Sequence, residues 1–210
     1  MVFVSTILLA AGESTRMGSQ KALLPWESTT LLEYQLAQLA AVDEIGEIIV
    51  VTGHEPERIR EVASLSPRTK IVHNHDYRAG KVGSILVGLR SAAYDTDAVM
   101  VIAVDQPRTA EVLRTIIETH ASSGSPIAVP EYRGRRGHPP IFTRELLPEL
   151  LLMTEDTQGL RAVLRIHADE VCEVDCDASV LVDLNRPGDV SSMSESKDLF
   201  DLPLGERKDR

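Results

Sequence analysis

The stretch "VFVSTILLAAGESTRMGSQKALLP", residues 2–25, joins a long apolar segment directly to a polar loop. The apolar segment, Val2–Ala10, is nearly continuous and rich in β-branched residues. Such a run is typical of a strand that is buried on both faces of a parallel sheet. Ligands of open parallel sheets bind beyond the carboxyl ends of the strands, so this loop is the first candidate for a binding site.

The loop combines glycines with positive charge. Gly12 and Gly18 allow a ligand to approach the backbone closely, and free N–H groups there can bind phosphate oxygens. Arg16 and Lys21 add two cations to a chain whose overall charge is strongly negative. These features suit a nucleoside triphosphate, and the alternative is an ordinary loop with solvated cations. The loop matches neither the P-loop pattern nor G-x-G-x-x-G, so those two nucleotide motifs do not apply.

Strand and helix patterns alternate through the first 120 residues. We expect strands at 2–10, 47–52, 70–74 and 98–104, and helices at 29–42, 56–65, 82–94 and 109–123. After Gly124 shorter strands are expected at 127–130, 139–143, 170–175 and 180–184, with helices near 146–152 and 159–166. The pattern predicts an α/β fold of three layers, Rossmann-like, with a mostly parallel sheet and a small antiparallel piece in the C-terminal half.

Composition limits the classes of protein that fit. The formal net charge of −10 disfavours binding to nucleic acid or to an anionic membrane. Two cysteines, Cys172 and Cys176, are too few for a disulfide scaffold, and their spacing is not that of a zinc knuckle. No apolar run reaches the ~18 residues of a membrane span, and the N-terminal run lacks the basic flank of a signal peptide. We therefore expect a cytoplasmic protein.

Carboxylates follow two of the expected strands. Asp105 comes directly after the strand at 98–104, where one aspartate beside bound phosphates can hold Mg²⁺. The alternative for Asp105 is a cap for the helix at 109–123. Asp183 and Asn185, in "VDLNRPGD", offer further oxygen ligands after a short strand, and the alternative there is a simple turn.

Two other loops carry candidate binding residues. Asn74 ends a strand, and Gly80 and Ser84 open a helix whose N-terminus can receive a ligand oxygen, with Lys81 as a further phosphate contact. The segment "RGRRGHPPIF", residues 133–142, gathers arginines and His138, which suits an anionic second substrate. The alternatives are a plain glycine loop and a solvated hairpin.

Five stretches in this order resemble the MobA-like nucleotidyltransferases, and most of all their molybdenum-cofactor cytidylyltransferase branch. The most specific is "LAAGESTRMGSQKALLPW", which fits the family loop L-A-A-G-x-S-x-R-M-G-x-x-K-x-L-L-P. The others are "DQP", "GKVGSILVGL", "GHP" and "DLNRPGD". The resemblance runs from residue 7 to 190 and implies one nucleotidyltransferase domain over residues 1–190. Residues 191–210 are polar and turn-rich, and we expect a flexible tail there.

The resemblance also implies roles for individual residues. Arg16, Lys21 and Asp105 are expected to be catalytic. The nucleotide is expected to contact Leu9, Ala10, Ala11, Gly12, Arg16, Lys21, Asn74, Gly80, Ser84 and Asp105. The acceptor is expected to contact Gln106, Gly137, His138 and Pro139. The metal, Mg²⁺, is expected on Asp105, Asp183 and Asn185.

The activity implied by the resemblance is transfer of CMP from CTP to a molybdopterin-type cofactor, with release of pyrophosphate. The form of Ala10–Gly12 is similar to that of cytidine-using members, which favours CTP over GTP. A molybdoenzyme or its chaperone is a candidate protein partner. The alternatives are an enzyme of the same fold that uses GTP or a sugar-phosphate acceptor, and a non-enzymatic protein that delivers the molybdenum cofactor. Gly83 and Arg108 depart from the branch pattern, and we expect both at the substrate edge.

Overall fold

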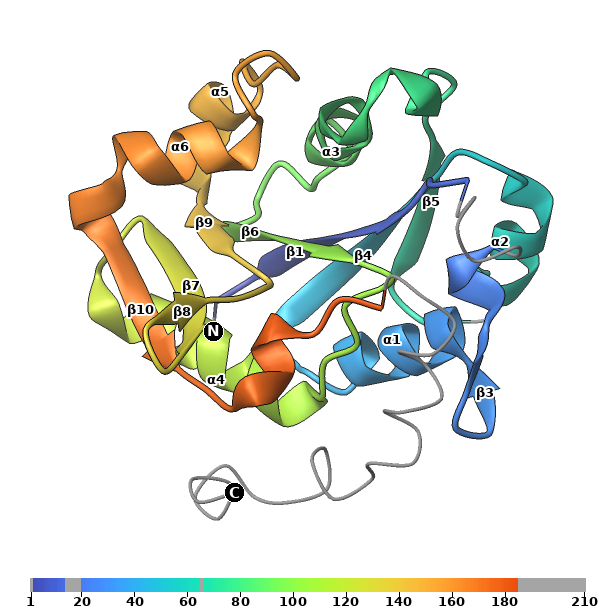
Figure 1. Cartoon of the computed structure of the whole chain (residues 1–210), viewed down its shortest axis with the longest axis horizontal. Coiled ribbons are helices and arrows are strands. Elements are labelled where there is room, and N and C mark those ends of the chain that lie inside the picture. Colours follow the sequence, from blue (N-terminus) through green and yellow to red (C-terminus); the bar gives the residue numbers. More distant parts are fainter. Residues whose placement is uncertain (1, 14–19, 65, 185–210) are drawn as a thin grey trace.

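A computed structural model describes residues 2–13, 20–64 and 66–184. Within these residues the main sheet has eight strands, and Figure 1 shows it crossing the middle of the molecule. The strands are β1 (Val4–Ala10), β4 (Ile45–Thr52), β5 (Thr69–His73), β6 (Ala98–Ala103), β7 (Ile127–Tyr132), β8 (Arg135–Arg136), β9 (Ile141–Thr143) and β10 (Val171–Asp175). The helices are α1 (Leu31–Ala40), α2 (Pro56–Ala63), α3 (Lys81–Leu89), α4 (Ala110–Ser123), α5 (Leu147–Leu150) and α6 (Leu160–Ile166).

The strand order in the sheet is β10-β7-β9-β6-β1-β4-β5, with β8 paired to β7. β1 runs parallel to both of its neighbours, β4 and β6, and β4 runs parallel to β5. β9 is antiparallel to β6 and to β7, whereas β7 and β10 are again parallel. The predicted α/β fold, with a mostly parallel sheet and an antiparallel piece in the C-terminal half, is therefore confirmed.

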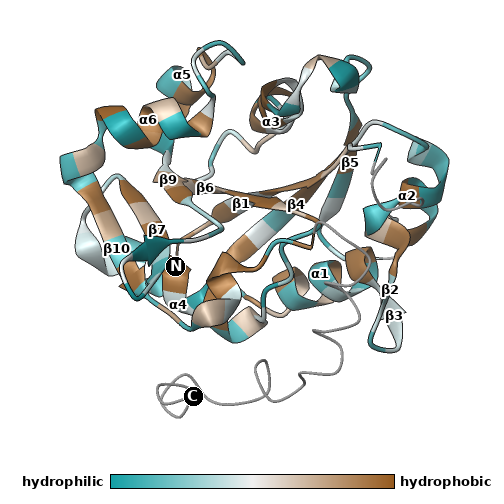
Figure 2. Cartoon of the chain, viewed as in Figure 1, coloured by the Kyte–Doolittle hydropathy of each residue, from teal (hydrophilic) through white to brown (hydrophobic). Residues whose placement is uncertain are grey.

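The sheet separates two hydrophobic cores. Successive residues of β1 face opposite sides, so Leu8 lies in the core beneath α1 and α4, whereas Ile7 and Leu9 lie in the core beneath α3. Figure 1 shows α1, α2 and α4 on one face and α3, α5 and α6 on the other. In Figure 2 the central strands are strongly hydrophobic, whereas the helices carry hydrophilic residues as well. All seven residues of β1 are buried, as its apolar run predicts.

Capping residues define the ends of α1 and α4. α1 begins with a capping box, in which the Thr30 hydroxyl accepts from the Glu33 N–H and the Glu33 carboxylate accepts from the Thr30 N–H. α4 begins after Thr109, whose hydroxyl accepts from the N–H of Val112. α4 ends at Gly124, which has a φ of 70° in the left-handed region.

Two local expectations need correction. The strand predicted at 180–184 is wrong, because a 3₁₀ helix, η5 (Ala178–Leu181), covers its first two residues and residues 182–184 form no strand. The Asp177 carboxylate starts this helix by accepting from the N–H of Ser179, a local bond that competes with extended structure. A short hairpin of β2 (Pro25–Trp26) and β3 (Thr29–Thr30) lies where no strand was expected.

Several other expectations have limited or no test. Both cysteines are free, and burial raises the pKa of Cys176 to about 12, so this thiol stays protonated. No helix in the described part of the chain is long and apolar enough to cross a membrane. Arg16, Asn185 and the predicted tail at 191–210 lie outside the described residues.

The buried His120 of α4 gives a testable pH dependence. Its side chain is desolvated, which lowers its pKa below 6.5. The unfolded chain then binds the proton more tightly than the fold, so the contribution of His120 is fully present above about pH 6.5 and is lost as the pH falls toward the folded pKa. We expect His120→Leu to reduce the difference in unfolding free energy between about pH 8 and about pH 5, measured by urea denaturation.

His167 provides a control of opposite sign. It contacts the carboxylates of Glu149 and Glu170 at 2.8 and 2.9 Å, and these hydrogen bonds raise its pKa. Its contribution is therefore present below about pH 6.5 and is lost as the pH rises through the folded pKa. His167→Gln should enlarge the same pH difference. If the difference in unfolding free energy between the two pH values were the same in His120→Leu as in the wild-type protein, the assignment would be contradicted.

Candidate active site

A pocket of about 460 Å³ lies at the carboxyl ends of β1 and β6. Its floor is the end of β1, and its walls come from the segment before β2, from the start of α3 and from the turn after β6. The lining residues are Leu9, Ala10, Ala11, Gly12, Gln20, Lys21, Ala22, Tyr77, Gly80, Lys81, Ser84, Ala103, Val104 and Asp105. The pocket therefore forms where a parallel sheet is expected to bind its ligand.

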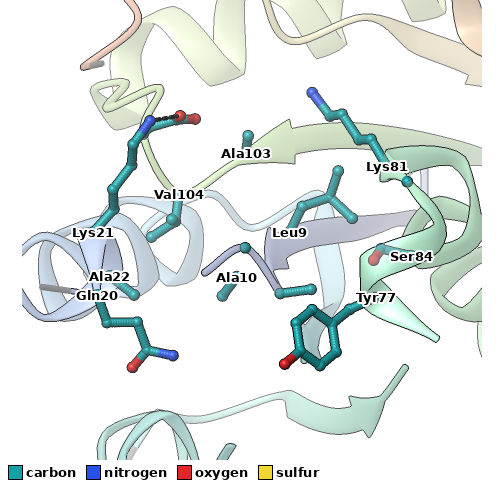
Figure 3. A pocket seen from close by; sticks show the side chains of 14 residues that line it. Leu9, Ala10, Gln20, Lys21, Ala22, Tyr77, Lys81, Ser84, Ala103 and Val104 are labelled. Carbon is teal, nitrogen blue, oxygen red and sulfur yellow. Dashed lines mark hydrogen bonds and ion pairs between the residues drawn. The ribbon is translucent and has the colours of Figure 1, made fainter. Parts of the chain in front are cut away.

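Figure 3 shows how charge is distributed around the pocket. Lys21 and Lys81 stand on opposite sides, with Leu9 and Ala10 between them. Gln20 and Tyr77 lie at another end of the pocket, where they offer an amide and a phenol instead of charge. A ligand with an anionic part and a neutral polar part fits this distribution. In an acidic chain, two amines on one pocket are a local reversal of sign.

Lys21 and Asp105 form an ion pair on the pocket wall. Lys21 Nζ lies 2.7 Å from Asp105 Oδ2, and Figure 3 draws this contact as a dashed line. Lys21 belongs to a 3₁₀ turn, η1 (Lys21–Leu23), whereas Asp105 follows β6, so residues 84 positions apart meet here. The two side chains are only 17% and 23% exposed, so a partly desolvated pair of opposite charges lines the site. The alternative role for Asp105 is excluded, because Thr109 caps α4.

Asn74 supports the site from behind the pocket wall. It is buried, and its Nδ2 donates to Ser84 Oγ at 3.0 Å, which holds the Ser84 hydroxyl on the first turns of α3. Asn74 is not among the lining residues, so the structure gives it a contact with a pocket residue instead of a place on the wall. Its predicted contact with nucleotide stays a prediction.

The first turn of α3 is shaped by Gly80 and Glu155. Gly80 has a φ of 135°, a conformation that side-chain-bearing residues rarely adopt, and the Glu155 carboxylate occupies the space that a Cβ would need. Glu155 Oε1 accepts from the Val82 N–H at 2.6 Å and so satisfies one of the free N–H groups of the helix. Gly80 thus lines the pocket and allows this capping contact.

Tyr77 is a pocket residue that the sequence analysis missed. It lies in a 3₁₀ turn, η2 (Tyr77–Ala79), and packs against Gly53, where any Cβ would collide with Tyr77 and with the Ala11 carbonyl. Its neighbour Arg78 is ion-paired to Glu13 at 2.6 Å, which joins η2 to the first loop. Gln20 was also missed, and its Nε2 donates to the His54 carbonyl. Neither residue has a sequence signal that separates it from an ordinary loop residue.

The predicted acceptor loop lies against η5. Gly137 has no room for a Cβ because the Val180 carbonyl is too close, and the His138 N–H donates to that carbonyl at 2.9 Å. Pro139 follows a cis peptide bond and is buried. His138 is an exposed residue, yet partial desolvation of its ring lowers its pKa, and the Asp183 carboxylate acts in the opposite direction. The acceptor roles of these three residues stay predictions.

Gln106 is buried, unlike a residue of an open pocket wall. It is 4% exposed, its Oε1 accepts from the Ala103 N–H at 3.1 Å and its Nε2 donates to Asp183 Oδ1 at 2.8 Å. Its amide is therefore engaged within the protein on both sides. The predicted contact of Gln106 with the acceptor has no support in these hydrogen bonds.

Arg108 was expected at the substrate edge, and this expectation is wrong. The residue is fully buried, and burial lowers the pKa of its guanidinium to about 10. Its nitrogens donate to the carbonyls of Pro107, His138, Val180 and Val182 at 2.8–3.3 Å. Arg108 therefore ties the turn after β6 to the acceptor loop and to η5.

The oxygen ligands near Asp105 fit a hard divalent cation. Leu184 N–H donates to the Asp105 carbonyl at 2.8 Å, and Gln106 reaches from the next position to Asp183, so the two aspartates belong to adjoining segments. No group of three or more His, Cys, Asp or Glu side chains suited to a metal occurs among the described residues. An ion here would use few protein ligands and complete its shell with water and phosphate oxygens, as Mg²⁺ commonly does.

Comparison with known proteins agrees with a nucleotide-binding α/β enzyme. The chain is 32% identical over 185 residues to nicotine blue oxidoreductase of Paenarthrobacter nicotinovorans, which covers 82% of this chain and 87% of that protein. It is 26% identical over 196 residues to molybdenum cofactor cytidylyltransferase of Escherichia coli K12, and this alignment covers 93% of this chain and 97% of that protein. The crystal structure of Rv0371c from Mycobacterium tuberculosis superposes with a TM-score of 0.77 at 27% identity over 93% and 99%, and that protein has also been crystallised with manganese.

The fold and the pocket thus define a nucleotidyltransferase-type α/β protein. The MobA-like NTP transferase domain matches residues 6–171, and the chain belongs to this family. The resemblance found in the sequence is therefore confirmed at the level of the family.

Arg108 gives a stability prediction. In Arg108→Met the carbonyls of His138 and Val182 lose their donor, whereas that of Val180 keeps the His138 N–H. We expect a loss of roughly 2–5 kcal/mol of unfolding free energy, because a buried carbonyl left without a donor costs about 1–3 kcal/mol. Arg144→Met is the control, because Arg144 is exposed and donates to a single carbonyl, that of Tyr94. Chemical denaturation of both variants would check this. Equal losses of unfolding free energy in the two variants would show that the buried hydrogen bonds of Arg108 do not stabilise the fold more than an exposed arginine does.

Proposed function

We propose that the protein transfers CMP from CTP to the terminal phosphate of a molybdopterin-type cofactor and releases pyrophosphate. The observation that carries this proposal is the Lys21–Asp105 pair on a pocket whose other side is Lys81. Membership of the MobA-like family supports nucleotidyl transfer. The likeness to the cytidylyltransferase of Escherichia coli, together with the Ala10–Gly12 sequence, favours CTP and a molybdopterin acceptor.

The acceptor phosphate needs little activation. A phosphate monoester has a second pKa of about 6, so it is largely dianionic at neutral pH. One of its oxygens attacks the α-phosphorus of CTP, a new P–O bond forms, and the bond to the bridging oxygen of the β-phosphate breaks. Pyrophosphate leaves with the electron pair of that bond. The protein then has to align two anions and reduce their repulsion, which requires no base and no protein nucleophile.

Lys21 and Asp105 divide this electrostatic work. In the ion pair each neutralises the other. The Lys21 amine can exchange Asp105 for the triphosphate, and the Asp105 carboxylate would then be available to hold a divalent cation. Binding of nucleotide together with cation therefore replaces one ion pair by two favourable contacts. Arg16 adds positive charge to the same phosphates, as the resemblance of the first loop implies.

A divalent cation would be held by Asp105 and Asp183, with Asn185 as the ligand that the resemblance adds. When bound, such an ion supplies positive charge that offsets the repulsion between the two phosphate groups. We propose Mg²⁺ as the physiological ion. The manganese complex of the Mycobacterium tuberculosis protein shows that a structural relative takes up a divalent metal.

Pyrophosphate release is the decisive assay. We expect it with CTP, molybdopterin and Mg²⁺, with slower release from GTP and almost none when the acceptor or the metal is omitted. Replacing molybdopterin with a sugar phosphate tests the alternative acceptor. An arm with nicotine blue and a reductant is included because the relative from Paenarthrobacter nicotinovorans is named nicotine blue oxidoreductase. Binding of molybdopterin without pyrophosphate release from any nucleotide would indicate a delivery protein.

Asp105→Asn tests the carboxylate. The side chains are isosteric, so we expect the fold to persist and turnover to fall by about 10²-fold or more, because a charge at the reacting phosphates is lost. The control is Asp97→Asn, since Asp97 directly precedes β6 at its other end and accepts from the Phe3 N–H. Near-normal pyrophosphate release by the Asp105 variant would contradict the assignment.

Lys21→Met and Arg16→Met test the cations. A charged hydrogen bond to phosphate contributes about 1.5–3 kcal/mol, so each variant should lose about tenfold to a hundredfold in kcat/KM for CTP. Part of the loss should fall on kcat, because negative charge moves onto the departing pyrophosphate. Lys70→Met is the control, since Lys70 donates to the Ser91 carbonyl away from the pocket. If only KM for the acceptor rose, the first loop would belong to the other substrate.

A further inference from the structure

Gln35 is a fully buried amide on a helix whose other buried residues are leucines. It lies on α1, with Leu31, Leu32, Leu36 and Leu39 as its buried companions. A buried amide costs free energy unless its donor and acceptor are paired. An apolar residue would serve the core at this position without that requirement, so the partners of Gln35 show what the amide does.

The partners of Gln35 all lie in the turn that carries Asp105. Its Nε2 donates to the Gln106 carbonyl at 2.6 Å and, more weakly, to the Ala103 carbonyl at 3.4 Å. Its Oε1 accepts from the Arg108 N–H at 3.4 Å. These groups flank Asp105 on both sides. α1 therefore holds the turn through one side chain, although the two segments lie about 70 positions apart in sequence.

Gln106 carries this link onward to Asp183. Its backbone carbonyl receives the Gln35 amide, and its own amide accepts from the Ala103 N–H and donates to Asp183 Oδ1 at 2.8 Å. A second hydrogen bond joins the same two segments, because the Leu184 N–H donates to the Asp105 carbonyl at 2.8 Å. The backbone of Asp105 and the side chain of Asp183 are thus both tied to the group that Gln35 holds.

We propose that Gln35 is a positioning residue that fixes Asp105 and Asp183 relative to each other. It contacts neither carboxylate and acts through the turn and through Gln106. The importance of the two carboxylates rests on the proposed function. A buried donor that receives no competition from water keeps the pair in place before the nucleotide arrives, so little reorganisation is needed on binding.

A matched control lies one turn further along the same helix. Gln38 also reaches from α1 to the segment after β6, where its Oε1 accepts from the Ala110 N–H at 2.8 Å. That bond meets the start of α4 and does not touch the turn of Asp105. Gln35→Met and Gln38→Met each remove one glutamine through which α1 contacts the segment after β6, and both preserve side-chain volume. A general effect of weakened packing would appear in both variants.

The first measurement is hydrogen exchange of the full-length protein, followed by mass spectrometry. In Gln35→Met we expect exchange of the amides at 104–108 to accelerate by about tenfold or more, because local opening of the turn becomes easier. Gln38→Met should leave this segment unchanged. If Gln35→Met does not fold, Gln106→Glu tests the next link of the same path, because the new carboxylate keeps an acceptor for Ala103 and loses the donor to Asp183, while the backbone carbonyl that binds Gln35 is retained. We then expect weaker Mn²⁺ binding in Gln106→Glu, and unchanged binding would overturn the positioning role.

The second measurement is binding of Mn²⁺ in the presence of CTP, followed by the electron paramagnetic resonance signal of free Mn²⁺. We expect Gln35→Met to weaken this binding about tenfold to a hundredfold, the scale for small misplacements of a site, and Gln38→Met to change it less than about twofold. In turnover, the Gln35 variant should lose kcat more than it raises KM for CTP.

The outcomes separate the two proposals. Faster exchange at 104–108 in a protein that binds no Mn²⁺–CTP would contradict the proposed function and retain the positioning role of Gln35. Normal exchange and normal Mn²⁺ binding in Gln35→Met, in a protein that does transfer CMP, would overturn the positioning role alone. Equal effects of the Gln35 and Gln38 variants would also overturn it.

Discussion

The site depends on the position of β1 at the centre of the sheet. β1 is hydrogen-bonded on one edge to β4 and on the other to β6, and both of its faces are covered by helices. The register places Leu9 opposite Ala103, so β1 and β6 end at nearly the same level. The loop from β1 and the turn from β6 must therefore leave the sheet side by side. The Lys21–Asp105 pair is a consequence of this arrangement, because no local segment could bring these residues together.

Much of the fold could be predicted because buried parallel strands have a strong sequence signal. The runs at 2–10 and 98–104 contain almost no polar residues, which few structures other than a doubly covered strand allow. The chain direction of β9 was less certain, since three residues carry little periodicity. The stretch 180–184 was misassigned because apolar residues next to each other suit either a strand or a buried 3₁₀ turn, and the deciding contact is the Asp177 cap.

Site residues that are glycines or charged side chains in loops after strands could be predicted from the sequence. Site residues whose role depends only on tertiary contacts could not. Most of the proposed nucleotide contacts among the described residues line the pocket, and Asn74 lies behind it, bonded to Ser84. Tyr77 and Gln20 line the pocket because of the conformation of their loops, and tertiary contacts determine that conformation. Gln35 reads in sequence as an ordinary polar residue of an amphipathic helix. Its burial becomes visible only when α1 is packed against the turn after β6.

The buried guanidinium of Arg108 has a consequence for how the chain assembles during synthesis. Two of its four carbonyl partners, Val180 and Val182, lie 72 and 74 positions downstream, so the hydrogen bonds of the guanidinium are incomplete until residues 180–182 have left the ribosome. Until then the strands of the main sheet can form, while Arg108 has only the carbonyls of Pro107 and His138 to bind. The pocket and the contacts between Arg108 and η5 are therefore completed at different times. A nascent chain halted before residue 180 would hold every residue that lines the pocket, but it would lack the Val180 and Val182 carbonyls that bind Arg108.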